Sequence, residues 1–323
     1  MLMLAVNSDV TPSVMSMEAI ERDLARLEEA GFTHVQWGHD WEGEYIYSPF
    51  EMTQLRRIFE KHHLGVKGVH ASEGGKRARK IDGKLFFVNR RRNKENRKDY
   101  TSPDEYTRLA GVELIKNRVD LASELGTAEI VLHMQLPYEE LRESKDAAEE
   151  YWGQSLKSFD ELMPYCESRH IKIAMENMIC TPAQEQVAQF DRLFARYPKE
   201  FLGFCFDSGH CALMCPSDTA FFARRYIDRL IFVHLHDNDG VPDDSRSDDI
   251  AILRGDRHRI PFTGIVDWNE VTRLIASSPY ELPLTLEIDI HSPDEKGRAI
   301  ELHQAIEAGK KLDAMVARYR SRA

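Results

Sequence analysis

Eight short apolar runs alternate with stretches of helical periodicity along this chain of 323 residues. The runs are nearly continuously apolar, which is typical of parallel strands that are covered on both faces. The strands expected from them are residues 2–6, 32–37, 65–70, 128–133, 171–176, 202–207, 230–234 and 284–288. No Gly-x-Gly-x-x-Gly motif follows the first run, so a dinucleotide-binding open sheet is disfavoured. The number and order of the runs predict an α/β fold, a closed (β/α)8 TIM barrel that forms a single domain over residues 1–323.

Helical periodicity and capping signals mark the segments between these strands. Helices are expected over residues 18–30, 51–62, 104–125, 147–168, 182–197, 218–228 and 293–319, with another that begins at residue 267. Gly31 and Gly126 are expected to end two of them, because glycine adopts the left-handed conformation at little cost. After the strand at 202–207, Ser208 and Gly209 are expected to form a turn that presents His210.

Six of the eight apolar runs end in an imidazole or a carboxylate. These residues are His70, His133, Glu176, Asp207, His234 and Glu287. His210 follows Asp207 by three positions, and the loop after residues 230–234 adds Asp256 and His258 in an Asp-x-His arrangement. The C-terminal ends of the strands form one face in barrels of this type, so all these side chains are expected there.

A single histidine at the end of a strand is more often a hydrogen-bonded core residue than a metal ligand. So many acids and imidazoles around one cavity would repel one another or remain unsatisfied, and a bound cation relieves both problems. Oxygen and imidazole donors without thiolate suit Mn²⁺, Zn²⁺, Co²⁺, Fe²⁺ or Mg²⁺. The sequence therefore predicts a divalent metal centre without selecting the ion.

The five cysteines, at positions 166, 180, 205, 211 and 215, follow no Cys-x-x-Cys pattern. Cys205, Cys211 and Cys215 are expected to pack as small apolar groups. An odd number of cysteines without an evident leader sequence is typical of a reducing compartment, so a cytoplasmic location is expected. No apolar run approaches the roughly 18 residues of a membrane span, so no association with a membrane is expected.

A basic insert at about residues 74–100 interrupts an otherwise acidic chain. Eleven Lys or Arg residues between positions 76 and 98, against Asp82 and Glu95, give this segment a charge of +9. The whole chain carries −11, so the remainder carries −20, and general nucleic-acid binding is disfavoured. The run Arg90–Arg92 could meet phosphates at the active face. The favoured alternative is a loop that pairs with the acidic remainder or bridges the subunits of a homo-oligomer.

Five short motifs stand at the strand ends and in the loops that follow them. They are Glu-Asn at 176–177, Asp-Ser-Gly-His at 207–210, His-Leu-His-Asp-Asn at 234–238, Asp-Arg-His at 256–258 and Leu-Glu at 286–287. With these motifs in this order, the chain resembles the xylose-isomerase-like TIM barrel superfamily over nearly its whole length. That superfamily contains sugar and sugar-phosphate isomerases and epimerases, inosose-type dehydratases and abasic-site nucleases of the endonuclease-IV type.

The resemblance to the isomerases and epimerases implies a divalent metal ion (Mn²⁺, Zn²⁺, Co²⁺ or Mg²⁺) held by Glu176, Asp207, His234 and Glu287. His210 would lie beside the substrate, which is a sugar, a sugar phosphate or a polyol. His234 is preferred to His236 because the family pattern is His-Leu-x-Asp, and a register shifted by two would make His236 the ligand. The remaining candidates for metal or substrate binding are His70, His133, His210, His236, Asp256 and His258.

In this interpretation the ion binds a carbonyl and the adjacent hydroxyl of the sugar, acidifies the C–H bond of the hydroxyl-bearing carbon and stabilises an enediolate. One of Glu176 and Glu287 removes the proton and the other returns it. Trp37, His39 and Trp41 lie at and after the end of the strand at 32–37. They could form an aromatic wall for the sugar, or simply pack within their loop. The predicted function is thus metal-dependent isomerisation or epimerisation.

The abasic-site nuclease is the main alternative. Nuclease members carry a three-metal cluster, and the positions that it needs have counterparts at His70, His133, Glu176, Asp207, His210, His234, Asp256, His258 and Glu287. Two features count against DNA as the substrate. Residues 178–182 replace the glycine-rich turn that follows Glu-Asn in the nucleases, and the chain outside the insert is strongly acidic. An inosose-type dehydratase is a further alternative.

Overall fold

A computed structural model describes residues 3–10, 16–41, 43–74, 78–81, 84–87, 90–92, 96–243 and 248–322 of the chain. Eight parallel strands form one sheet in the order β10-β1-β2-β3-β6-β7-β8-β9. They are β1 (Leu4–Asn7), β2 (His34–Trp37), β3 (Gly65–His70), β6 (Glu129–Leu132), β7 (Lys172–Glu176), β8 (Leu202–Asp207), β9 (Leu230–His234) and β10 (Leu284–Leu286). Leu235, directly after β9, bridges to Leu286, and its N–H donates to Thr285 O at 2.9 Å. This contact closes the sheet on itself, and the predicted (β/α)8 barrel is confirmed.

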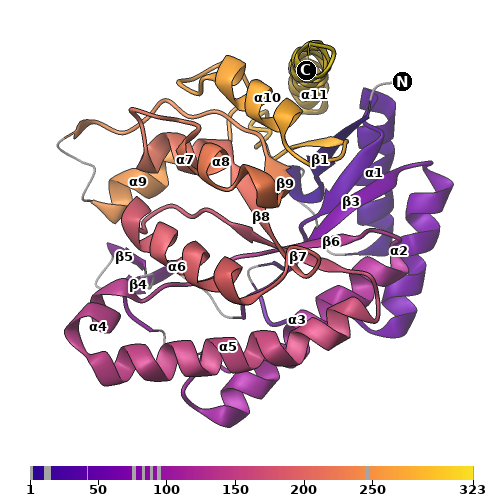
Figure 1. The fold of residues 1–323 in the computed structure, drawn as a ribbon. Coiled ribbons are helices and arrows are strands. Elements are labelled where there is room, and N and C mark those ends of the chain that lie inside the picture. The colour runs from indigo at the N-terminus through magenta and orange to yellow at the C-terminus, as the bar shows by residue number, and fades with distance from the viewer. Residues whose placement is uncertain are drawn as a thin grey trace.

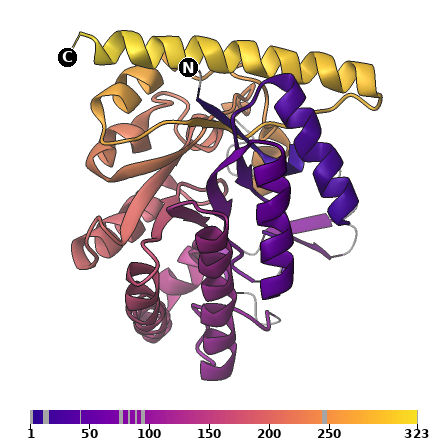
Figure 2. The same ribbon diagram turned by 90° about the vertical axis from the view of Figure 1, so that its right-hand side faces the viewer.

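Helices connect the strands and surround the barrel (Figure 1). They are α1 (Met17–Ala30), α2 (Pro49–Lys61), α3 (Glu105–Glu124), α4 (Tyr138–Glu143), α5 (Lys145–Glu167), α6 (Ala183–Arg196), α7 (Ser208–Met214), α8 (Phe221–Arg225), α9 (Asp249–Gly255), α10 (Trp268–Ser277) and α11 (Glu295–Arg320). The long helix α11 lies across one side of the barrel, where it packs against α1 and α10 (Figure 2). Over the described part of the chain, every helix is too short or too polar to cross a membrane.

Short polar side chains begin several of these helices. Ser48 caps α2 in a capping box with Glu51, and a proline occupies the first turn. Asp104 and Ser144 cap α3 and α5 by accepting hydrogen bonds from backbone N–H groups three residues further on. Gly31 ends α1 in the left-handed conformation, with a φ of 103°, as its position in the sequence predicts.

Two expectations about the chain after β8 are wrong. Ser208 and Gly209 do not form a turn but begin α7. The Asp207 carboxylate accepts a hydrogen bond from His210 N at 2.6 Å and so caps a helix at this point. The helix expected over residues 218–228 is shorter, because α8 is followed by a separate 3₁₀ turn at Ile227–Arg229.

Side chains alternate between the two faces of each barrel strand, and this alternation separates two sets of residues. One set points outward into the main core beneath the helices. The other set points into the barrel, where a small cluster forms what we call the interior layer: Val131, Ala174, Cys205 and Phe232. Each member stands two residues before an imidazole or carboxylate of the predicted site, namely His133, Glu176, Asp207 and His234. The interior layer is therefore the floor beneath those strand ends.

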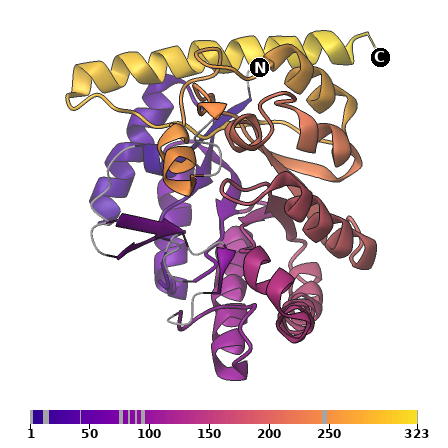
Figure 3. The ribbon, with the colours of Figure 1, turned by 90° about the vertical axis from the view of Figure 1, so that its left-hand side faces the viewer.

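The basic insert leaves the barrel after β3 and contains an antiparallel hairpin that the sequence analysis did not predict. Its strands, β4 (Ala78–Ile81) and β5 (Lys84–Phe87), form a two-stranded sheet of their own. The hairpin lies on the same side of the molecule as α4 and α9 (Figures 1 and 3). All three follow the C-terminal ends of barrel strands, so the insert belongs to the rim of the active face.

The three consecutive arginines of the insert pair with acidic side chains of the same chain. Arg90 binds Asp249 at the start of α9, with N–O distances of 2.6 and 2.7 Å. The further ion pairs join Arg90 to Glu139, Arg91 to Glu143, and Arg92 to Glu140 and Glu150. This pairing agrees with the favoured contact between the insert and the acidic remainder. The positions 76, 77, 82, 94 and 95 of the insert lie outside the described residues, as do the side chains at 79, 80 and 84.

Gly111 allows α3 to lie directly on the backbone of residues 99 and 100. A Cβ at this position would lie 2.3 Å from Tyr100 N and 2.6 Å from Asp99 C. We expect Gly111→Ala to lower the free energy of unfolding by about 1–3 kcal/mol, because backbone atoms must move apart. Gly153→Ala in α5 is the matched control. Nothing lies within 4 Å of its added Cβ, so we expect a gain of about 0.5–1 kcal/mol. Urea denaturation measures both, and equal effects would contradict the close approach.

Candidate metal centre and active site

Four acidic or imidazole side chains from neighbouring strands meet at the mouth of the barrel. Glu176, Asp207 and His234 end β7, β8 and β9, and Glu287 follows β10 directly. One donor atom from each lies within 4.8 Å of all the others. His234 Nδ1 is 3.0 Å from Glu287 Oε2, 3.2 Å from Glu176 Oε1 and 3.8 Å from Asp207 Oδ2. The structure thus brings together these four residues, which we call the four-residue centre.

Three of the four residues of this centre each have a buried donor atom without a well-formed hydrogen bond. Among the described residues, Glu176 Oε1, His234 Nδ1 and Glu287 Oε2 have no hydrogen-bond partner. Leaving such an atom unpaired in the interior costs about 1–3 kcal/mol, and more when it is charged. A cation between the three would satisfy all of them at once. Carboxylate and imidazole donors in this arrangement therefore fit a divalent ion.

Two further groups of potential ligands adjoin the four-residue centre. The first is His70, His133 and Glu176, in which Glu176 Oε2 lies 3.0 Å from His133 Nε2 and 3.7 Å from His70 Nε2. The second is His210, His236, Asp256 and His258, in which Asp256 Oδ2 lies 3.3 Å from both His210 Nε2 and His258 Nε2. Glu176 faces the first group with one oxygen and the centre with the other, so its carboxylate joins the two.

The protonation states of these groups compensate one another. Burial, reinforced by the nearby His133, lowers the pKa of His70 to about 3, which leaves this imidazole neutral and able to donate a lone pair. Burial alone would raise the pKa of Glu176, but His234 and His133 hold it well below its usual range. Burial also opposes protonation of His258, yet Asp256 raises its pKa to about 10. Without a bound cation, protons on some of the imidazoles thus offset the negative charge of the carboxylates, which a bound cation would otherwise do.

His234 and His236 belong to different groups, although one residue separates them. His234 is a member of the four-residue centre, whereas His236 Nε2 lies 3.0 Å from both oxygens of Asp207 and its ring stacks on His258 at 4.1 Å. Gly209 makes room for this ring, since a Cβ there would lie 2.1 Å from His236 Cε1. His234 thus lies among the members of the centre, whereas His236 lies between Asp207 and the second group, and the choice of His234 as the metal ligand stays a prediction.

Two residues that the sequence analysis did not assign a role contact the predicted ligands. The Asn177 side chain exchanges two hydrogen bonds of 2.9 Å with the backbone of Asp207, and Asn177 O lies 2.9 Å from His210 Nδ1. Gln36 Nε2 lies 2.8 Å from His234 Nε2. The signal for Gln36 is strand alternation: if Trp37 points toward the helices, the residue before it points into the barrel.

Trp41 lies against the first group of ligands, as an aromatic wall would. Its ring centre is 5.0 Å from that of His70 and 5.2 Å from that of His133. Arg118, which is completely buried in α3, holds the loop that carries Trp41. Its guanidinium donates to Asp40 O at 3.3 Å and to Tyr45 O at 2.9 Å.

Trp37 and His39 occupy other positions. Trp37 is completely buried, packs on Phe59 of α2 with 6.1 Å between ring centres, and donates to the Tyr47 hydroxyl at 3.0 Å. It therefore faces the helices rather than the barrel interior, in agreement with the packing alternative. His39 is buried with its ring centre 4.7 Å from that of Trp37.

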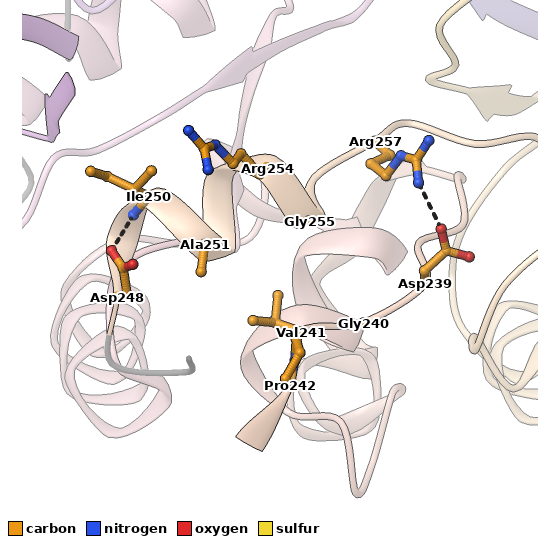
Figure 4. Close-up of a pocket in the computed structure, with 10 residues that line it drawn as sticks. All are labelled: Asp239, Gly240, Val241, Pro242, Asp248, Ile250, Ala251, Arg254, Gly255 and Arg257. Carbon is orange, nitrogen blue, oxygen red and sulfur yellow. Dashed lines mark hydrogen bonds and ion pairs between the residues drawn. The ribbon is translucent and has the colours of Figure 1, made fainter. Parts of the chain in front are cut away.

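A surface cavity of about 310 Å³ lies between α9 and the loop after β9 (Figure 4). Its lining includes Gly255 and Arg257, which flank Asp256, and Asp239, which accepts a hydrogen bond from Arg257 at 3.0 Å. The described residues that line it include no member of the four-residue centre or of the two adjoining groups. The cavity is therefore a neighbour of the candidate site rather than a part of it.

The fold and the strand-end ligands together define a class of protein, a (β/α)8 barrel with mixed carboxylate and imidazole donors at its mouth. Residues 24–309 match the family described as Xylose isomerase-like TIM barrel. The chain belongs to this family, as the motifs at its strand ends indicate.

Relatives and solved structures extend over nearly the whole chain. The uncharacterized protein y4fM of Sinorhizobium fredii (strain NBRC 101917 / NGR234) is 34% identical over 310 residues, which are 95% of this chain and 92% of that protein. A D-tagatose 3-epimerase-like protein superposes with a TM-score of 0.66 at 20% identity and covers 99% of both chains. D-allulose 3-epimerase from Methylomonas sp., in complex with D-allulose, superposes with a TM-score of 0.63 at 17% identity, covering 98% of this chain and 97% of that one. The solved structures share the fold.

Gln36 is expected to orient the ring of His234 for metal binding. If Nδ1 faces an ion, Nε2 carries the proton and must donate to an acceptor. Gln36 Oε1 has no partner among the described residues, and a half-turn of the amide brings it toward His234 Nε2. We expect Gln36→Leu to weaken Zn²⁺ binding by about 10–100-fold in isothermal titration calorimetry. Gln304→Leu on the exposed face of α11 is the control, and equal affinities would show that Gln36 does not position the ligand.

Proposed function

We propose that this protein is a divalent-metal-dependent isomerase or epimerase that acts on a sugar, a sugar phosphate or a polyol. The observation that carries the proposal is the four-residue centre, in which Glu176 and Glu287 approach His234 Nδ1 at 3.2 and 3.0 Å. Two carboxylates beside one cation site are what a two-base proton transfer needs. The sugar 3-epimerases among the solved structures of the same fold support the choice of a sugar-like substrate.

The residues of the proposed reaction have separate roles. A bound divalent ion would polarise a carbonyl and the adjacent hydroxyl, which makes the C–H bond of the carbon that bears this hydroxyl acidic. One of Glu176 and Glu287 removes this proton and the other returns it, through an enediolate. Burial opposes the ionisation of both carboxylates, but in the metal-free protein the adjacent His234 holds the pKa of each below its usual range. A bound ion would favour the ionised carboxylates in the same way, so both would be available as bases. Trp41 covers one side of the bound sugar.

The two glutamates give the direct test of this reaction. We expect Glu176→Gln and Glu287→Gln each to lower turnover by about 10²–10⁴-fold, because each substitution removes a base and keeps the size of the side chain. The measurement is the exchange of substrate C–H with D₂O over a panel of ketoses, after reconstitution with Mn²⁺, Zn²⁺, Co²⁺ or Mg²⁺. Glu60→Gln on the exposed face of α2 is the control. Near-full turnover in either variant would rule out the two-carboxylate reaction.

One observation favours an alternative, the three-metal abasic-site nuclease. The first adjoining group shares Glu176 with the four-residue centre, and the second contacts it through His236 and Asp207. Both groups contain residues that the nuclease pattern requires. The charge of the chain argues against this alternative, since its net value is −11. The arginines of the insert that are best placed to meet phosphates are also engaged with acidic side chains.

Metal content separates the two functions. For the isomerase or epimerase we expect about one ion per chain by mass spectrometry of the dialysed protein, and no cleavage of abasic duplex DNA. Protein that carries this single ion should then catalyse the exchange of deuterium into a ketose. A content of about three zinc ions per chain, together with cleavage at abasic sites, would replace the isomerase by the nuclease.

A further inference from the structure

Cys205 lies on the floor of the four-residue centre. It belongs to β8 and to the interior layer, stands two residues before Asp207, and is completely buried. Its sulfur, one oxygen of Glu176 and one nitrogen of His234 lie within 4.8 Å of one another. The thiol therefore shares two neighbours with the centre and approaches them from the inside of the barrel.

The surroundings of this thiol point to a ligand rather than to packing alone. The other members of the interior layer, Val131, Ala174 and Phe232, are apolar and offer no donor atom. Above the layer, Glu176 Oε1 and His234 Nδ1 are buried and lack hydrogen-bond partners among the described residues. A thiol on the floor thus lies close to two residues above it that each carry an unpaired buried donor atom.

The other cysteines have different environments. Cys166 is buried in α5, Cys180 Sγ lies 3.7 Å from Asp249 O, and Cys211 Sγ lies 3.8 Å from Asp218 O. Within the described part of the chain, Cys205 is the one cysteine grouped with carboxylate and imidazole donors. Cys205 packs in the interior layer as the expected small apolar group, and donor atoms of Glu176 and His234 lie close to its sulfur in addition.

We propose that Cys205 is a thiolate ligand of the metal centre and makes it selective for thiophilic ions such as Zn²⁺, Co²⁺ and Cd²⁺ over Mg²⁺ and Mn²⁺. This inference rests on the proposed metal centre and adds a ligand to it. When the ion binds, the Sγ–H bond breaks, its proton passes to solvent and the Sγ–metal bond forms. A ligand on the floor leaves the side toward the mouth open for the substrate, as a catalytic metal site requires.

The chemistry of sulfur sets this selectivity. A coordinated metal deprotonates a thiol, and thiophilic ions form bonds to sulfur strong enough to offset that loss. Mg²⁺ prefers oxygen donors and gains little from sulfur, so it leaves the thiol protonated.

Cobalt spectroscopy on the full chain tests the assignment, because thiolate bound to Co²⁺ gives a charge-transfer band in the near ultraviolet. We expect the metal-free protein titrated with Co²⁺ to show this band beside the visible d–d bands. Cys205→Ser, which keeps the size of the side chain, should lose the charge-transfer band and keep the d–d bands. Cys166→Ala is the control and should keep both. Competition between Zn²⁺ and Mn²⁺ should show a preference for Zn²⁺ that falls at least about tenfold in Cys205→Ser.

The outcomes distinguish failure of the thiolate ligand from failure of the metal centre itself. Wild-type protein that binds Co²⁺ with d–d bands but without the charge-transfer band overturns the thiolate and leaves the four-residue centre standing. Protein that binds no Co²⁺ overturns both. Absence of the band from the wild-type spectrum overturns the thiolate ligand whether or not Cys205→Ser folds. A charge-transfer band that persists in Cys205→Ser would assign the thiolate to another cysteine and refute the proposal.

Discussion

The buried carboxylate of Glu176 is the interaction on which the rest of this site depends. It meets His133, His234 and His210 at 3.0, 3.2 and 3.3 Å, and these histidines come from three other segments of the chain. A carboxylate taken out of water without partners carries a penalty of several kcal/mol, so its burial is tolerated only where proton-bearing or cationic partners converge. Such convergence needs strands β6 to β9 side by side with their ends level, which the closed barrel provides. The same barrel then holds Asp207 and Glu287 close enough to share one ion.

The alternation of side chains explains how a polar centre and an apolar floor occupy the same barrel. On each of β6, β7, β8 and β9, the inward positions carry an apolar or sulfur-containing residue and then, two residues later, a potential ligand. The floor is filled partly by Phe232, whose ring occupies the space beside Gly68 in β3. A Cβ at Gly68 would lie 2.5 Å from that ring. A buried apolar floor of this kind lowers the local dielectric constant and strengthens the interactions of the charged groups above it.

The parts of the site that follow strand periodicity could be predicted, and the parts that depend on competing local preferences could not. Continuous apolar runs locate the strands, and the shared face of their C-terminal ends groups six candidate ligands, among them Glu176, Asp207, His234 and Glu287. The choice of these four as one ligand set is implied by the family resemblance and not by strand periodicity. Ser208 and Gly209 favour a turn by composition, yet the Asp207 carboxylate caps a helix there instead. As an aromatic residue Trp37 suits a wall for a sugar, but its position in the alternation of β2 directs its side chain outward, toward the helices. Arg90 of the insert pairs with Asp249, which lies 159 residues further along the chain. Local sequence patterns carry no information about a pair so far apart.

The insert at the rim of the barrel and the second ligand group are held in place by different interactions. This difference matters for substrate selection. The insert is attached through ion pairs of partly exposed side chains, which salt screens and which contribute little individually. The second ligand group is attached through the backbone instead. Asp237 and Arg259 exchange two backbone hydrogen bonds of 2.8 and 2.9 Å, and Arg257 N donates to Asn238 Oδ1 at 2.7 Å. Backbone hydrogen bonds thus fix the loop of Asp256 and His258 beside β9, whereas ion pairs hold the insert at the rim. Loops that vary around a fixed centre are the means by which barrels of this type change substrate while they retain their chemistry.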